Sequence, residues 1–136
     1  MSRYLTHDPI DVGNLVAQVS DPGRGGTVLF LGSVRRSEED GAVASIEYSA
    51  YEEMVVAEFE RIVAEAKARW PDAVCRVAHR LGDVPVGEPS IAVVAAAPHR
   101  REAFEACRFL IEEAKRRLPV WKHERFEDGT KRWRGG

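Results

Sequence analysis

A helical pattern bounded by two prolines is the feature of this sequence that most restricts its fold. Apolar residues recur three and four positions apart within HRREAFEACRFLIEEAKRRL, residues 99–118. This spacing predicts an amphipathic helix with one stripe against a core. Pro98 precedes the stretch and Pro119 follows it, and because proline disrupts helical geometry the helix is expected to lie between them. The predicted stripe consists of Phe104, Cys107, Ile111, Ala114 and Leu118.

The rest of the chain alternates between strand-like and helical segments. A second amphipathic helix is predicted from Glu52 to about Trp70, where Pro71 stops it. Period-two or continuous apolar runs predict strands, and Asp128-Gly129 suits the turn of a short hairpin. The order β-β-α-β-β-α-β predicts an α+β protein, a single domain over residues 1–136, with a mixed or antiparallel sheet and two main helices. The predicted strands are 27–31 (buried), 43–51, 73–82, 91–98 (central) and a hairpin over 120–133, with a turn over 83–90.

Composition narrows the classes of function. The 136 residues contain two cysteines, Cys75 and Cys107, each within an apolar pattern, which predicts buried thiols. The four histidines have no metal-ligand spacing, so we expect neither a metal nor a cofactor. The N-terminus lacks a signal-peptide core and no run of about 18 apolar residues occurs. We therefore expect a cytoplasmic protein that does not enter a membrane.

The charges are distributed unevenly. Residues 115–136 carry eight bases and three acids, whereas the chain as a whole has a net charge of -2. A basic end on an acidic body indicates an anionic ligand or an acidic partner surface. A nucleic-acid-binding module is the alternative, because Trp121, Phe126 and Trp133 lie among these bases. The sequence pI of about 6.1 argues against it, since such domains are usually basic.

Cationic residues gather where the predicted elements end. Arg35 follows the first strand, and His99 and Arg100 stand where a helix N-terminus favours phosphate or carboxylate. Lys115 and Lys122 lie on either side of the exit from that helix. Exposed arginines and lysines are most often solvated surface residues. A lysine in a partly dry pocket among other cations has a lowered pKa, however, and the neighbouring Arg116 and Arg117 are predicted to lower that of Lys115. His79 and Arg80, at the end of the third strand, form a further cluster.

Four stretches follow one another along the chain: FLGSVR, IEYSAYEEM, HRLGDVPVGE and HRREAFEACRFLIEEAKRRLPVWKHE. Together, and in this order, they resemble motifs of the large, catalytic subunit of molybdopterin synthase. The stretch FLGSVR resembles the family's loop with an arginine, and IEYSAYEEM its tyrosine-rich strand before the first helix. HRLGDVPVGE resembles its His-Arg-x-Gly turn, and HRREAFEACRFLIEEAKRRLPVWKHE is similar to its longest signature. The resemblance runs from about Gly26 to Trp133 and implies an α/β-hammerhead-like fold.

The resemblance also implies a reaction and a site. The family adds two sulfurs to cyclic pyranopterin monophosphate, making molybdopterin, and takes them from the C-terminal Gly-Gly thiocarboxylate of a small ubiquitin-like carrier subunit. Lys115 and Lys122 match the catalytic lysines, while Arg35, His99 and Arg100 match substrate-binding residues. The implied assembly is a homodimer with a small subunit at each end, a heterotetramer. In it, the His-Arg pair serves the pocket of the neighbouring protomer.

Two features of the sequence depart from that pattern, and one further alternative is open. The charged insert RRSEEDG, residues 35–41, belongs to this chain and leaves the edge of the pocket open. The chain ends in Gly135-Gly136, like a sulfur carrier, but its length and pattern do not suit a small β-grasp domain. A subunit that has lost activity is a further alternative. The presence of both lysines, Arg35 and the His-Arg pair argues against it.

Overall fold

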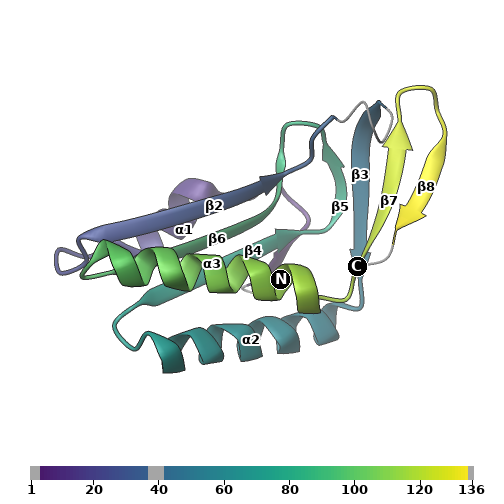
Figure 1. Ribbon diagram of the computed structural model, residues 1–136. Helices are drawn as coiled ribbons and strands as arrows, with labels where there is room; N and C mark the ends of the chain where they lie inside the picture. Colours follow the sequence, from purple (N-terminus) through teal and green to yellow (C-terminus); the bar gives the residue numbers. More distant parts are fainter. Residues whose placement is uncertain (1–3, 37–41, 135–136) are drawn as a thin grey trace.

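The computed structural model describes residues 4–36 and 42–134, which form two four-stranded sheets and three helices (Figure 1). The residues of the insert from 37 to 41 and the terminal Gly135-Gly136 lie outside the described residues.

The first sheet has the order β1-β4-β6-β2 and the second β5-β3-β7-β8. All pairs are antiparallel except β1 with β4. The first sheet contains β1 (Leu5–Thr6), β4 (Val74–Arg80), β6 (Pro89–Ala97) and β2 (Gly26–Ser33). The second contains β5 (Gly82–Pro85), β3 (Val43–Ala50), β7 (Val120–Phe126) and β8 (Lys131–Arg134), and the helices are α1 (Val12–Val19), α2 (Glu52–Arg69) and α3 (Arg100–Arg117).

Helices cover both faces of the first sheet, with β6 at its centre. One face of β6, which includes Val94, packs with Leu15 and Val19 of α1. The other face, which includes Val93, belongs to the main core with α2 and α3. Because side chains alternate along a strand, an apolar run such as that of β6 suits a strand covered on both sides. The predictions of an α+β fold, of two long helices, of a central strand over 91–98 and of the C-terminal hairpin are thus confirmed.

The structure adds elements to the predicted order. Helix α1 and strand β1 precede the first predicted strand, and β5 occupies the start of residues 83–90, which were predicted as a turn. The strands also separate into two sheets rather than one. Helix α1 has only eight residues, and the side chain of Asp11 caps it by accepting from the N–H of Asn14 at 3.0 Å.

Two predictions of burial are wrong. Strand β2 was predicted to be buried, but it forms the edge of the first sheet, and Leu29, Phe30 and Leu31 are 37–40% exposed. In α3, Phe104 is 60% exposed, and the buried stripe is turned by about one position toward Ala103 and Leu110. The periodicity located the helix correctly, but the neighbouring strand determines which apolar side chains are covered. These exposed side chains leave an apolar surface on β2 and α3 of a single chain.

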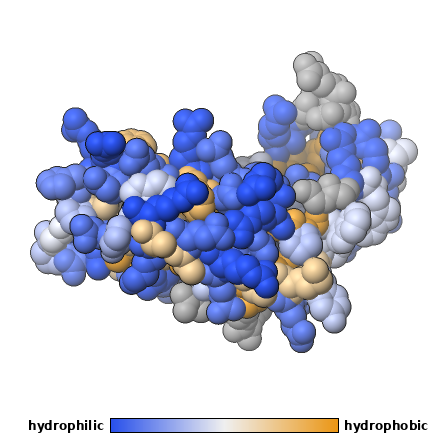
Figure 2. Space-filling model, turned by 60° about the horizontal axis from the view of Figure 1, so that its bottom comes forward, coloured by the Kyte–Doolittle hydropathy of each residue, from blue (hydrophilic) through white to orange (hydrophobic). Residues whose placement is uncertain are grey.

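Ion pairs fix the C-terminal end of α3 against α2. The Arg117 guanidinium donates to Glu65 at 2.9 Å through two nitrogens, to Glu58 at 2.6 Å and to Glu113 at 3.2 Å. On the face shown in Figure 2, hydrophilic side chains predominate over the helices. A bidentate guanidinium–carboxylate contact constrains geometry more than a lysine contact can. The last turn of α3, which carries Lys115, is therefore held in place relative to the core.

Candidate active site

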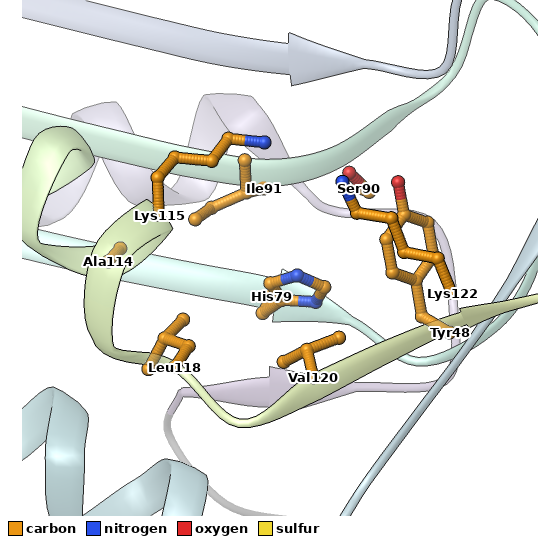
Figure 3. Close-up of a pocket in the computed structure, with 9 residues that line it drawn as sticks. All are labelled: Tyr48, His79, Ser90, Ile91, Ala114, Lys115, Leu118, Val120 and Lys122. Carbon is orange, nitrogen blue, oxygen red and sulfur yellow. The ribbon is translucent and has the colours of Figure 1, made fainter. Parts of the chain in front are cut away.

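Lys115 and Lys122 converge on one small recess between α3 and β7 (Figure 3). This lysine recess has a volume of about 40 Å³. It adjoins a wider cavity of about 240 Å³, which we call the outer cleft. Tyr48, Ser90 and both lysines line both spaces. The remaining residues of the lysine recess are His79, Ile91, Ala114, Leu118 and Val120.

The local fold explains why seven residues of separation bring the two lysines together. Helix α3 ends at Arg117, Leu118 is its C-cap, and the chain enters β7 at Val120. Alternation along β7 places Val120 and Lys122 on one side, toward the core, while Trp121 on the other side is 56% exposed. Lys122 lies opposite Tyr48 in the β3–β7 pair. The resemblance implied that both lysines belong to one site, and this geometry is consistent with that expectation. Leu118 and Val120, and not the exposed Trp121, contribute to the apolar wall of the recess.

Lys115 has a pKa below the usual lysine value. The first cause is burial, because the packed surroundings desolvate the ammonium even though the side chain remains accessible from the outer cleft. The second cause is the positive charge of Lys122. The predicted lowering of the Lys115 pKa in a partly dry pocket is confirmed, but the predicted contribution of Arg116 and Arg117 is wrong. Arg116 pairs with Glu113 and Arg117 pairs with three glutamates, so neighbouring carboxylates offset both charges.

This electrostatic coupling leads to a test that does not depend on any activity. In Lys122→Gln the pKa of Lys115 should rise, because a like charge is removed, yet it should stay below the ordinary value because burial remains. An NMR titration of reductively ¹³C-methylated lysines measures it directly. Lys131→Gln, which removes a charge at an exposed position of β8, is the control and should leave the titration of Lys115 unchanged. An unchanged Lys115 titration in Lys122→Gln would contradict the coupling.

The structure adds three residues to the predicted lysines. Tyr48, His79 and Ser90 bring polar groups into the lysine recess from β3, β4 and β6. Burial, the main cause, raises the pKa of Tyr48, so its phenol stays protonated near neutral pH. Burial likewise lowers the pKa of His79 to about 4, so that its ring is neutral there. The His-Arg-x-Gly motif drew attention to His79 in the sequence, but nothing local to it indicates that β4 ends beside the two lysines.

Arg35 lies in the outer cleft together with both lysines and Arg134. The buried carboxylate of Glu124, on the same side of β7 as Lys122, orients Arg134 by accepting a hydrogen bond from its Nε at 2.6 Å. Glu124 also accepts from Arg132 at 3.2 Å. The outer cleft is consequently lined by several cations and one carboxylate that is already engaged by arginines. Such a cleft suits an anionic ligand.

His99 and Arg100 lie at the opposite end of α3. At 1.5 Å per residue the helix axis separates His99 from Lys115 by roughly 24 Å. The two residues line an open surface with Gly25, Pro98 and Arg101. Strand β2 begins directly against this helix start, since a Cβ on Gly26 would lie 2.9 Å from the Arg100 Cα. One chain therefore brings Arg35, Lys115 and Lys122 together, and it does not bring the His-Arg pair to them.

The two cysteine thiols do not supply a nucleophile to this site. Cys75 and Cys107 are buried, and burial raises both thiol pKa values to about 11, so neither is a thiolate near neutral pH. Across residues 4–36 and 42–134 no group of three or more His, Cys, Asp or Glu side chains is arranged to bind a metal ion. In the same described part of the chain, no helix is long and apolar enough to cross a membrane.

Comparison with known proteins shows the family. The sequence model of the MoaE protein family matches residues 5–117, a stretch that includes Lys115 and ends before Lys122. The molybdopterin synthase catalytic subunit of Pyrococcus abyssi is 43% identical over 122 residues, covering 90% of this chain and 82% of the relative. That of Drosophila willistoni is 40% identical over 132 residues, covering 96% of this chain. The chain spans only 36% of the length of this second relative.

A solved structure shows the same fold over the whole chain. The crystal structure of molybdopterin synthase from Staphylococcus aureus superposes with a TM-score of 0.92 at 28% identity, covering 100% of this chain and 99% of that one. The two-sheet arrangement that carries the lysine recess is therefore shared with a solved molybdopterin synthase. Together, the match over residues 5–117, the relatives about 40% identical and the shared fold place this chain in the MoaE family of molybdopterin synthase catalytic subunits.

Proposed function

We propose that this chain converts cyclic pyranopterin monophosphate to molybdopterin, using sulfur from the C-terminal thiocarboxylate of a small ubiquitin-like carrier subunit. The convergence of Lys115 and Lys122 on one recess, open to a cleft that contains Arg35, is the observation that carries this proposal. Both reactants are anions, and preorganised cations in a partly dry site stabilise them without reorganisation. The net charge of the whole chain does not determine this local field.

The size and shape of the two spaces support a division of roles. The lysine recess is narrow enough for the end of an extended glycine tail, whereas the outer cleft offers room and positive charge for the pterin phosphate. The sulfur of the thiocarboxylate attacks an oxygen-bearing carbon of the pterin side chain, so that a carbon–sulfur bond forms while the carbon–oxygen bond breaks and the oxygen leaves with a proton. Water then cleaves the acyl–sulfur bond and leaves the carrier as a carboxylate. Each carrier supplies one sulfur, so one pterin requires two.

Lys115 is the group we assign to proton transfer in this sequence of steps. Its lowered pKa places a larger fraction of the amine in the neutral form near pH 7 than an ordinary lysine has. Lys122, across the lysine recess, is assigned to orienting the pterin or its phosphate. Both assignments follow from position, because the lysines enter the recess from different elements and leave the space between them for the reacting groups.

A homodimer completes the proposed site. His99 and Arg100 lie too far from Lys115 in one chain to contact the same substrate, so we assign them to the pocket of a neighbouring protomer. The exposed apolar side chains of β2 and Phe104 of α3 lie on elements that adjoin this pair, and such a surface is typical of a subunit contact. A carrier subunit at each end of the dimer gives a heterotetramer.

Binding of the substrate phosphate should depend on Arg35 and Arg100. A charge-assisted hydrogen bond contributes roughly 1.5–3 kcal/mol, so either Ala substitution should weaken binding of cyclic pyranopterin monophosphate by about ten- to a hundredfold. Titration calorimetry measures this affinity. Arg36→Ala is the matched control, since Arg36 pairs with Glu127 at 3.3 Å and does not line the outer cleft. Unchanged affinity in both Arg35→Ala and Arg100→Ala would assign these arginines to the solvated surface.

Turnover tests the proposed function itself. Purified protein, cyclic pyranopterin monophosphate and a thiocarboxylated carrier should yield the dithiolene product. The same carrier as a carboxylate should yield none. Absence of product with the thiocarboxylated carrier, under conditions in which both ligands bind, would contradict the proposal.

A further inference from the structure

The lysine recess offers many hydrogen-bond donors and one imidazole nitrogen that can only accept. Its polar side chains are those of Lys115, Lys122, Tyr48, Ser90 and His79. Protonated lysines only donate, and hydroxyl groups both donate and accept. The ring of His79 lies between the two lysine side chains in Figure 3. Whether its outward nitrogen, Nε2, donates or accepts a hydrogen bond therefore determines which ligands the recess recognises.

The backbone fixes that role. Nδ1 of His79 lies 2.8 Å from the carbonyl oxygen of Arg80, and because a carbonyl oxygen only accepts, Nδ1 must carry the proton. The ring is 6% exposed and packs edge-on against Tyr48, with 5.3 Å between ring centroids. It is neutral near pH 7, so Nε2 carries a lone pair. Within the described residues, no side chain or backbone group is found to hydrogen-bond to Nε2.

We propose, building on the proposed function, that His79 binds the carrier tail: its Nε2 accepts the N–H of the terminal glycine while Lys115 contacts the thiocarboxylate. The end of such a tail has the sequence –NH–CH₂–C(=O)S⁻, which places one donor two bonds from an anionic group. The lysine recess presents the complementary pair, the Nε2 acceptor of His79 and the amine of Lys115. Sulfate, which is fully ionised near neutral pH, has no donor for Nε2. His79 thus distinguishes a chain terminus from a simple anion.

The apolar wall adds the requirement for glycine. Ile91, Leu118 and Val120 surround the same 40 Å³, a space that leaves little room for a side chain on the terminal residue. A hydrogen bond from the terminal N–H to His79 also fixes the rotation of the tail about its last bonds. The sulfur atom is then directed toward the outer cleft, where the pterin is proposed to bind.

An amide-to-ester substitution in the carrier removes this one donor without adding bulk. The probe is a semisynthetic carrier that ends in Gly-Gly carboxylate, compared with one in which glycolate replaces the last glycine. Calorimetry with the full-length protein should show that the ester binds about tenfold more weakly, the effect of one buried hydrogen bond. In His79→Asn, which keeps an N–H near Arg80 and loses Nε2, the two probes should bind equally. Ser90→Ala, the control within the same recess, should keep the tenfold difference.

The two probes separate this inference from the function on which it rests. Equal affinities of amide and ester for the unmodified protein, or the same ester penalty in His79→Asn, would overturn the role of His79 while leaving carrier binding intact. His79→Phe provides the same comparison if His79→Asn does not fold. No binding of the Gly-Gly carrier to the unmodified protein would instead contradict the proposed function, and the inference with it. If His79 had a purely structural role, His79→Asn would weaken the binding of both probes by the same factor, and the tenfold difference between them would remain.

Discussion

Lys115→Ala and Lys115→Arg should both reduce single-turnover formation of molybdopterin by about a hundredfold or more, the usual contribution of a positioned acid or base. The arginine variant keeps the positive charge, but a guanidinium does not give up its proton near neutral pH. Lys115→Arg therefore separates proton transfer from electrostatic stabilisation. The measurement uses a carrier that has been thiocarboxylated beforehand, so that only the transfer step is observed.

Two controls keep this result specific. Arg116→Ala, one position away and paired with Glu113 on the surface, should react at a near-normal rate. Carrier docking and dimer formation should persist in both Lys115 variants, because those contacts extend over more than one side chain. A near-normal rate for Lys115→Arg would show that only the charge of this lysine matters, and its assignment to proton transfer would be wrong.

Mixing two impaired variants, at a substrate concentration too low to saturate Arg100→Ala, should restore activity if the site is shared between protomers. A hybrid dimer of Lys115→Ala with Arg100→Ala contains one site with both defects and one site with neither. Random exchange between protomers of a two-fold dimer makes half of the dimers hybrids, so about a quarter of the wild-type activity should return. This distribution follows from the separation of Lys115 and Arg100 along α3, which prevents one chain from supplying both groups to a single substrate.

The control for this experiment is a pair of variants that damage the same half of the site. Lys115→Ala mixed with Lys122→Ala should stay inactive if both lysines are essential, since each hybrid site then lacks one of them. Subunit exchange must first be verified, for example by native mass spectrometry of differently tagged protomers. A Lys115→Ala and Arg100→Ala mixture no more active than its parents after exchange would contradict a shared site.

Local pattern predicted the elements better than it predicted their burial. The period of 99–118 and its prolines located α3, because these signals act within the segment. The exposure of Phe104 and of Leu29–Leu31 depends instead on which strand lies at the sheet edge, a long-range property that periodicity does not contain. The eight residues of α1 are few for a helical period, and packing on β6 supports this helix.

The candidate site was predictable to the extent that it is local. Lys115 and Lys122 are seven residues apart across one turn, so sequence and resemblance together indicated that they meet. Tyr48, His79 and Ser90 join them only because β3 pairs with β7, and because β4 ends and β6 begins nearby. The lowered pKa of Lys115 was predicted, but from the wrong cations, because the glutamates around Arg116 and Arg117 come partly from α2.

Sulfur transfer from carrier to pterin is the central claim, and a labelled single turnover tests it most directly. A carrier with an isotopically labelled thiocarboxylate sulfur is mixed with this protein and cyclic pyranopterin monophosphate, and both products are analysed by mass spectrometry. The account predicts that the label appears in the dithiolene of the pterin, that the carrier returns as a carboxylate, and that Lys115→Ala blocks both changes. Label that stays on the carrier, or is released as free sulfide without entering the pterin, would contradict it.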